Sequence, residues 1–240
     1  MTTTTKREQY AALVSARKRC RLCVGLRNPA DAELAAFDSD EIGPWSRLHG
    51  DLDADLMIIG QDWGGVRYYA VNQGLDDLRN PTMRTLERLL RGIGLDISLA
   101  EYGAGARGVF LTNAVLCLKK GGLQAPVEWQ WFENCGSHFL RRQIEIVAPR
   151  VAVALGQKAY EAVLGAFGLQ VGPFRRAVEN ELGTPLPNGS RLLAVYHCGQ
   201  RILNTHRPFE QQQREWRRVA KALGQQQRAE SRPATTQSRH

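Results

Sequence analysis

Residues 56–65, "LMIIGQDWGG", decide how this chain folds. The stretch begins as a short, continuous apolar run, which is typical of a strand buried on both faces of a parallel sheet. The run stops at Gly60, and an amide and a carboxylate follow at Gln61 and Asp62. Glycines beside such groups let a ligand or another backbone approach closely. The stretch therefore predicts a buried strand whose end carries a binding site.

The rest of the chain repeats this pattern of apolar runs and amphipathic segments. Strands alternating with helices form right-handed crossovers, so we expect an α/β fold of three layers, with a central, mainly parallel four-stranded sheet. We expect one domain over residues 1–224 and a disordered polar tail over 225–240. The other predicted strands are 108–116, 150–156 and 191–197, and the predicted helices are 6–19, 80–95, 129–148, 157–167 and 209–223.

Composition narrows the class of protein. The 240 residues suffice for one large domain, and the net charge of +8 suits a polyanionic partner such as nucleic acid, although it also fits a merely basic surface. No apolar run reaches the length of about 18 residues that spans a membrane. The N-terminal "MTTTTKREQY" lacks the apolar core of a secretory signal. We therefore expect a cytoplasmic protein, monomeric and without a membrane partner.

Five cysteines occur in a chain with no export signal, which favours a metal or redox role over disulfides. Cys20 and Cys23 are two residues apart, so both sulfurs can reach one metal centre. Cys117 lies just past the second predicted strand, and Cys135 lies in the following predicted helix. Zinc and a [4Fe–4S] cluster both accept four thiolates, and spacing alone does not choose between them. Alternatively, Cys117 and Cys135 are ordinary buried thiols.

Polar residues gather at the predicted strand ends, where ligand sites of open α/β sheets lie. Asp62, Asn113 and His197 each fall at or near such an end. The amide of Asn113 offers one acceptor and two donors, which suits the Watson–Crick edge of a base. Each residue alone has a plain structural explanation, such as a turn for Asp62 or a satisfied core imidazole for His197. Their convergence on one sheet edge favours a shared site.

In these residues the chain resembles the uracil-DNA glycosylase superfamily, from about Arg19 to about Arg218. The stretch "GQDWGG" resembles the water-activating motif, which reads G-Q-D-P-Y-H in one bacterial and eukaryotic family. The second predicted strand, "GVFLTNAVLC", resembles the strand whose Asn recognises uracil. "PRVAVALGQKA" resembles a strand and turn of the iron–sulfur glycosylases. "AVYHCGQR" stands where the superfamily has H-P-S and the loop that enters DNA.

The cysteines resemble those of the iron–sulfur members of the family 4 type. These members carry C-x-x-C near the N-terminus, a third Cys four residues after the strand Asn, and a fourth at the start of the next helix. The resemblance implies a structural [4Fe–4S] cluster, in preference to zinc, at Cys20, Cys23, Cys117 and Cys135.

The chain also departs from these families. Iron–sulfur members usually read G-E-A-P-G at the first motif, with no carboxylate where Asp62 stands. Trp63 replaces the usual Pro, and Gly64 stands where the G-Q-D-P-Y-H family has the Tyr that excludes the methyl group of thymine. The resemblance therefore does not imply strict selection of uracil over thymine.

The resemblance implies a DNA glycosylase of base-excision repair, which hydrolyses the N-glycosidic bond of uracil or another deaminated or damaged base. Such an enzyme first flips the base out of the duplex. Asp62 would orient water and stabilise the sugar cation, and His197 would donate a hydrogen bond to the departing base. The other implied roles are base binding by Gly60, Gln61 and Asn113, base stacking by Tyr69 (with Tyr68 as second choice), and DNA contact by Lys119, Lys120, Arg201 and Arg207.

Two other functions remain open at this point. The fold could read uracil- or lesion-containing DNA without cutting it, which the unusual "HCGQ" at 197–200 and Trp63 would favour. The chain could instead be a zinc-stabilised α/β enzyme that acts on a small nucleotide. Cys198, beside the proposed catalytic His197, is expected to be an inert buried thiol.

Overall fold

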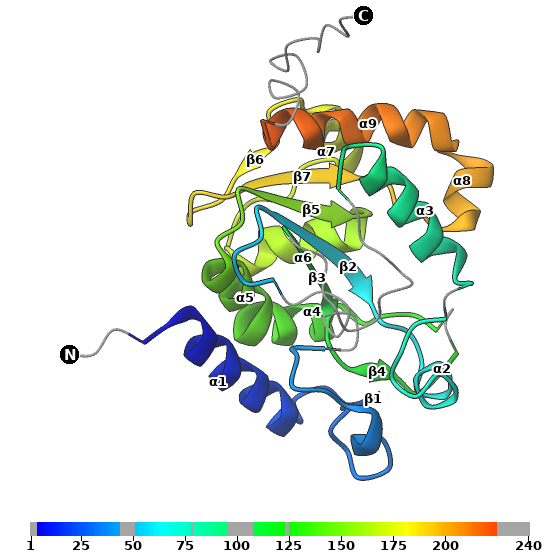
Figure 1. The fold of residues 1–240 in the computed structure, drawn as a ribbon. Coiled ribbons are helices and arrows are strands. Elements are labelled where there is room, and N and C mark those ends of the chain that lie inside the picture. Colours follow the sequence, from blue (N-terminus) through cyan, green and yellow to red (C-terminus); the bar gives the residue numbers. More distant parts are fainter. Residues whose placement is uncertain (1–3, 44–50, 78, 96–107, 123–124, 225–240) are drawn as a thin grey trace, which may run out of the picture.

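The computed structural model describes residues 4–43, 51–77, 79–95, 108–122 and 125–224, and the predicted tail at 225–240 lies outside them (Figure 1). Helices and strands alternate along the described chain, as predicted. In chain order the elements are α1 (Lys6–Arg19), β1 (Leu26–Arg27), η1 (Ala35–Phe37), β2 (Leu56–Asp62), α2 (Val66–Val71), α3 (Pro81–Arg91), β3 (Val109–Val115), β4 (Leu118–Lys119), α4 (Trp129–Cys135), η3 (Gly136–Leu140), α5 (Arg141–Val147), β5 (Val151–Leu155), α6 (Gln157–Ala166), α7 (Phe174–Glu179), β6 (Thr184–Pro185), β7 (Arg191–Val195), α8 (Gln200–Thr205) and α9 (Phe209–Ala222).

The central sheet has the strand order β3-β2-β5-β7-β6. The first four are parallel neighbours and are the four predicted strands, so the predicted α/β class and parallel sheet are confirmed. The predicted count of four strands is one too low, because β6 pairs antiparallel with the edge of β7. β6 is two residues long and ends in Pro185, so it leaves no apolar run to detect.

Helices cover both faces of this sheet (Figure 1). Successive strand residues point to opposite faces, so Met57 and Ile59 pack into one core while Leu56 and Ile58 pack into the other. The first core is closed by α1, α4, η3, α5 and α6, and the second by α2, α3 and α9. The strands are buried on both faces, which explains why they read as continuous apolar runs.

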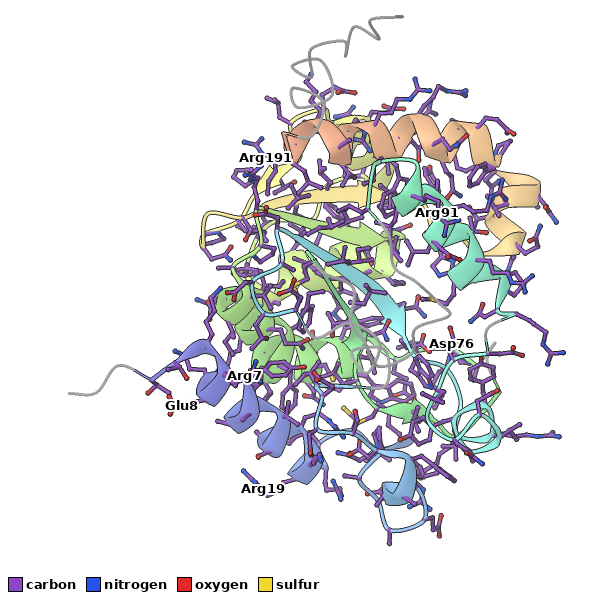
Figure 2. The ribbon with its side chains drawn as sticks, viewed as in Figure 1. Arg7, Glu8, Arg19, Asp76, Arg91 and Arg191 are labelled. Carbon is purple, nitrogen blue, oxygen red and sulfur yellow. The ribbon has the colours of Figure 1, made fainter. Side chains whose placement is uncertain are left out.

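The helix predicted at 6–19 is α1, and a capping box begins it: the Thr5 hydroxyl accepts from the Glu8 N–H, and Glu8 accepts from the Thr5 N–H. Its charged side chains Glu8 and Arg19 point away from the sheet (Figure 2). The helix predicted at 129–148 runs as α4, a π-helical turn (η3) and α5, and it ends at Ala148, whose φ of 49° is left-handed.

Three short helices, α2, α7 and α8, were not predicted, because each has only six residues. A separate antiparallel ribbon, β1 with β4, was also missed. It joins the segment after Cys23 to the segment after Cys117, and both strands have two residues. In the part of the chain that the structure describes, no helix has the length and apolar character needed to cross a bilayer.

Candidate active site

The carboxyl ends of β2, β5 and β7 form one edge of the sheet, and their arrowheads point toward the side where α2, α3 and α8 lie (Figure 1). Asp62 ends β2, and His197 follows β7 by two residues. Strand spacing sets β2 and β7 about 10 Å apart, with β5 between them. Gly156, which follows β5 with a φ of 92°, has no side chain to stand between the two, and a Cβ there would lie 3.5 Å from the Cβ of His197.

Asn113 and Gly60 face each other across β3 and β2 as register partners. A Cβ on Gly60 would lie 2.3 Å from the Oδ1 of Asn113, so only glycine leaves room for this amide. Asn113 is 3% exposed, and among the described residues its Oδ1 has no hydrogen-bond partner. A buried acceptor without a donor is costly to a folded protein. Such an acceptor is well placed to receive an N–H from a bound molecule.

Both carboxylate oxygens of Asp62 have partners. The Nε2 of Gln61 donates to Oδ2 at 2.8 Å, and the Nζ of Lys119 forms an ion pair with Oδ1 at 3.1 Å. Lys119 also donates to the carbonyl of Ala125 at 3.1 Å, and its side chain is only 4% exposed. Lys119 therefore does not lie where a DNA phosphate would reach it, contrary to the role expected from the sequence, because it turns inward to a buried carboxylate.

The imidazole of His197 is fixed in one orientation. The backbone N–H of Gly199 donates to Nδ1 at 3.0 Å, so Nδ1 carries the lone pair and Nε2 carries the proton of the neutral ring. Burial lowers the pKa of His197, and the nearby carboxylate of Asp62 opposes this effect. Gln212, fully buried in α9, donates to the carbonyl of His197 at 3.3 Å. Sequence spacing gave no signal for Gln212, because it lies 15 residues away on another element.

The lowered pKa gives a prediction for acid conditions. The imidazole of His197 should titrate below its ordinary value of 6.5. At pH values below the ordinary pKa of 6.5 and above the lowered pKa of the folded state, the unfolded chain binds the proton and the folded chain does not. The free energy of unfolding therefore falls as the pH drops through this window. NMR titration of the ring, with urea unfolding at several pH values, measures both effects, and His197→Gln should weaken the pH dependence. A ring that titrates at or above 6.5 would contradict the buried, neutral imidazole.

The two tyrosines considered for base stacking are placed differently from expectation. Tyr69 is 1% exposed and packs into the core on the inner side of α2, with its ring edge-to-face with Phe37 at 6.4 Å. Tyr68 is half-buried, and its hydroxyl donates to the carboxylate of Asp76 and accepts from the N–H of Asp77. The stacking role of Tyr69 is not supported, because a core-facing helix position leaves its ring no open face.

The predicted DNA-contacting cations divide into two pairs. Lys120 and Arg201 are exposed, beside β4 and on α8 respectively, as a phosphate contact by Lys120 and entry of Arg201 into the duplex would require. Arg207 instead pairs with Glu215 at 3.3 Å, and its guanidinium stacks 4.2 Å from the ring centroid of Tyr196. Like Lys119, Arg207 is held within the fold, so its predicted phosphate contact is not supported.

The four cysteines of the predicted cluster come together although they are far apart in sequence. They line one cavity of about 60 Å³, which α1, the β1 segment and α4 enclose. Among the described residues, no three thiol, imidazole or carboxylate groups converge closely enough to hold a single metal ion. The cavity is lined by Cys20, Cys23, Cys117 and Cys135, with Asn134 and Phe139 among their neighbours.

The thiols influence one another's protonation. A hydrogen bond from Cys135 lowers the pKa of Cys23 to about 6, and the same bond raises the pKa of Cys135. Burial raises the pKa of Cys117 to about 12, and the neighbouring Cys20 and Cys23 add to this effect. With raised pKa values, Cys117 and Cys135 stay protonated at neutral pH, and only a bound cationic centre would hold all four groups as thiolates.

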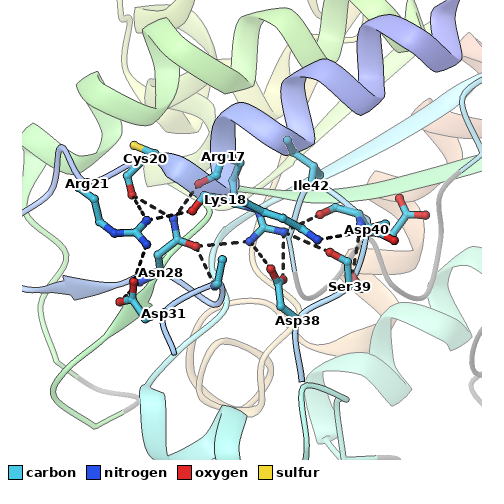
Figure 3. A network of polar contacts seen from close by, with 12 residues as sticks. Arg17, Lys18, Cys20, Arg21, Asn28, Asp31, Asp38, Ser39, Asp40 and Ile42 are labelled. Carbon is cyan, nitrogen blue, oxygen red and sulfur yellow. Dashed lines mark hydrogen bonds and ion pairs between the residues drawn. The ribbon is translucent and has the colours of Figure 1, made fainter. Parts of the chain in front are cut away.

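A polar network holds Cys20 at the end of α1 (Figure 3). Arg17, 1% exposed, forms two hydrogen bonds to the carboxylate of Asp38, at 2.9 and 3.0 Å. The Nδ2 of Asn28 donates to the carbonyls of Arg17 and Cys20, at 2.7 and 3.0 Å. These contacts fix the end of α1 at the start of the C-x-x-C segment. Pairings over 8 to 21 residues within a loop have no periodic sequence signal.

A second cavity, of about 390 Å³, lies between α4 and α6. Neither this cavity nor the thiol cavity is lined by Asp62, Asn113 or His197. The pocket that we expect among these three side chains therefore stays a prediction. Cys198 is fully buried, as expected, and burial raises the pKa of its thiol to about 12.

The chain is similar in sequence to known proteins. A family model described as the uracil DNA glycosylase superfamily matches residues 48–222. A type-5 uracil-DNA glycosylase of Pyrobaculum aerophilum is 31% identical over 174 residues, covering 69% of this chain and 69% of that protein. A type-5 uracil-DNA glycosylase of Thermus thermophilus is 30% identical over 207 residues, covering 82% of this chain and 90% of that protein.

Proposed function

The chain belongs to the uracil-DNA glycosylase superfamily and is a hydrolase of the N-glycosidic bond, and from this premise we propose that it excises uracil and related deaminated bases from DNA. The observation that carries the proposal is the buried Oδ1 of Asn113, which has no hydrogen-bond partner among the described residues. Asn113 lies opposite Gly60, two residues before Asp62 on the neighbouring strand. The N3–H of uracil would supply the missing donor, and its O4 would accept from the Asn113 amide. Cytosine has a lone pair at N3 and a donor at C4, so the same amide rejects it.

Two groups would act as the bond between C1′ of the sugar and N1 of the base breaks. Positive charge grows on the sugar and negative charge on the base. The carboxylate of Asp62 would stabilise the sugar cation and orient the water that adds to C1′, accepting the proton from that water. The Nε2–H of His197 would donate to O2 of the departing base, which takes up the negative charge. Preorganised groups of this kind contribute about 3–4 kcal/mol each to a barrier.

Thymine presents the same donor and acceptor as uracil and differs by one methyl group. Gly64 has no side chain to exclude this methyl group, and its φ of 120° is a conformation that an L-residue such as Tyr rarely adopts. We therefore propose that the site accepts a class of bases with an N3–H beside a C4 carbonyl, rather than uracil alone.

Cleavage of labelled oligonucleotides tests the function. Single strands and duplexes with U·G, U·A and T·G pairs are incubated with the protein, and alkali reveals abasic sites. We expect abasic sites at uracil in each context and none at cytosine. Lesion-selective binding without any release of a base would favour a non-catalytic reader and overturn the proposal.

We further propose that Cys20, Cys23, Cys117 and Cys135 hold a [4Fe–4S] cluster, to which four thiolates are suited. Four sulfurs that share a cavity without converging on one point fit a cluster, in which each binds a different iron, better than one zinc ion. Thiolates around zinc lie within about 4 Å of one another. When bound, the cluster would supply a structural cross-link between the C-x-x-C segment and the 118–135 region, through Cys117 just before it and Cys135 at its end.

Metal analysis tests this assignment. Protein purified without oxygen should be brown and carry about four irons per chain. Cys117→Ser and Cys23→Ser should lose iron and unfold at lower urea concentration, because the cross-link between distant segments is lost. Cys198→Ser is the matched control, since Cys198 is buried in the other core, and it should keep its iron. Colourless protein with one zinc per chain would contradict the cluster.

A further inference from the structure

Lys119 lies buried beside the carboxylate that would activate water. Its Nζ is 3.1 Å from the Oδ1 of Asp62, and the two side chains are 4% and 8% exposed. Lysine is almost never buried unless it is paired, so the position of its ammonium depends on this carboxylate. The reverse also holds: Lys119 and Gln61 between them engage both oxygens of Asp62 and so set the plane of the carboxylate.

The backbone of Lys119 is fixed independently of its side chain. Its N–H donates to the carbonyl of Gly64 at 2.9 Å, and it forms a bridge with Gly65 in the turn that follows Asp62. A Cβ on Gly65 would lie 2.6 Å from the carbonyl oxygen of Gly121, so the two turns are in close backbone contact. Lys119 is thus anchored to the same turn whose carboxylate it pairs with.

The other side of Lys119 leads to the thiol cavity. β4 pairs antiparallel with β1, with Leu26 opposite Lys119, and Cys117 precedes Lys119 by two residues. The N–H of Lys120 donates to the carbonyl of Gly25 at 3.4 Å, next to the C-x-x-C segment. One short hydrogen-bonded ribbon therefore connects the cysteine segments with the end of β2.

Resting on the proposed function, we propose that Lys119 is a positioning residue for Asp62: its ammonium holds the carboxylate in the orientation that water activation requires, and it makes no contact with DNA. The ribbon of β1 and β4 sets where Lys119 lies, so the cysteine-bearing segments support the carboxylate through it. A displacement of about 1 Å at a reacting group costs about 100-fold in rate, which sets the expected size of the effect.

Single-turnover kinetics on a uracil duplex test this role. Lys119→Met should lower the rate about 100-fold and leave the affinity for DNA and its salt dependence unchanged. Lys119→Arg, which keeps the charge, should recover to within about tenfold of the wild type. In an Asp62→Asn background, Lys119→Met should change the rate less than about threefold, because the two residues act as one unit. The matched control is Lys6→Met, which breaks the exposed Lys6–Asp53 pair and should leave the rate unchanged.

Three results would overturn the proposal. Losses in Lys119→Met and Asp62→Asn that simply multiply would show that the residues act separately. If Lys119→Met binds DNA more weakly, and the slope of log affinity against log salt concentration falls by about one, Lys119 contacts a phosphate. A covalent protein–DNA complex that borohydride traps in the wild type and that Lys119→Arg abolishes would give the amine a chemical role of its own.

Failure of the proposed function would look different. A wild-type protein that releases no base from any substrate overturns the glycosylase assignment. The pairing is still measurable then by urea unfolding of Lys119→Met, Asp62→Asn and the double variant. Strong coupling between the two substitutions would support the pairing, and additive effects would overturn it. If Lys119→Met does not fold, Lys119→Gln, which keeps a hydrogen-bond donor, carries the same comparison.

Discussion

Asp62→Asn should lower the single-turnover rate of uracil release about 10³-fold while the protein still binds uracil-containing DNA. The substitution keeps the shape of the side chain and removes the negative charge, so the sugar cation and the attacking water lose their stabilising partner. It also leaves the buried ammonium of Lys119 without a counter-ion, and removal of one partner of a buried pair costs about 3–5 kcal/mol of folding stability.

Rapid-quench assays and a binding titration on the same duplex separate the rate from the affinity. Urea unfolding checks that the variant is folded under the assay conditions. Asp62→Asn combined with Lys119→Met should regain part of the lost stability without regaining rate, because no unpaired buried charge remains. A rate within about tenfold of the wild type in folded Asp62→Asn would remove Asp62 from the proposed chemistry.

Asn113→Ala should have the second-largest effect, with a large loss of activity and little change in stability. The rate of uracil release should fall about 100-fold, because the base loses its partners at N3 and O4. Stability should change by no more than about 1 kcal/mol, because the substitution removes a buried acceptor that has no partner within the described part of the chain, and this gain offsets the lost packing. Such a split is typical of a residue kept for binding rather than for folding.

Gly60→Ala tests the position of the Asn113 amide without changing Asn113 itself. A Cβ at position 60 would lie 2.3 Å from the Oδ1 of Asn113, so the amide must move. We expect a loss of activity similar to that of Asn113→Ala, with a larger loss of stability, because strain is added where Asn113→Ala removes an unpaired group. Stability and single-turnover rates of both variants check this order. Full activity in Gly60→Ala would show that the amide of Asn113 does not need its present position.

The main elements could be predicted because their signals are local. The apolar runs at 56–60, 108–116, 150–156 and 191–197 mark strands that the sheet buries on both faces. The boundaries of α1 follow from a cap and a periodic pattern within its 14 residues. The strands missed by prediction, β1, β4 and β6, are two residues long, which is too short for a period of two to show. Only their partners across the ribbon or sheet define them.

Some features of the candidate site could likewise be predicted from local sequence, and others could not. That Asp62, Asn113 and His197 lie on parallel strands, or just past them, toward the same edge of the sheet could be predicted, since parallel strands bring their carboxyl ends together. A shared pocket among the three side chains stays a prediction. The partners of these residues could not be predicted. Tyr69 was assigned to the base and lies in the core, because a one-position rotation of a short helix decides which ring faces inward.

The sequence by itself determined the alternation of strands and helices, the polar residues at the strand ends and the four cysteines that now share a cavity. Only the tertiary structure decided that Lys119 pairs with Asp62, 57 residues away, and that Gln212 donates to the carbonyl of His197, 15 residues away. The physical reason is the range of each interaction. Burial imposes a period on neighbouring residues, whereas the distant partner of a buried charge or carbonyl is set by strand register and loop path, which leave no mark on local sequence.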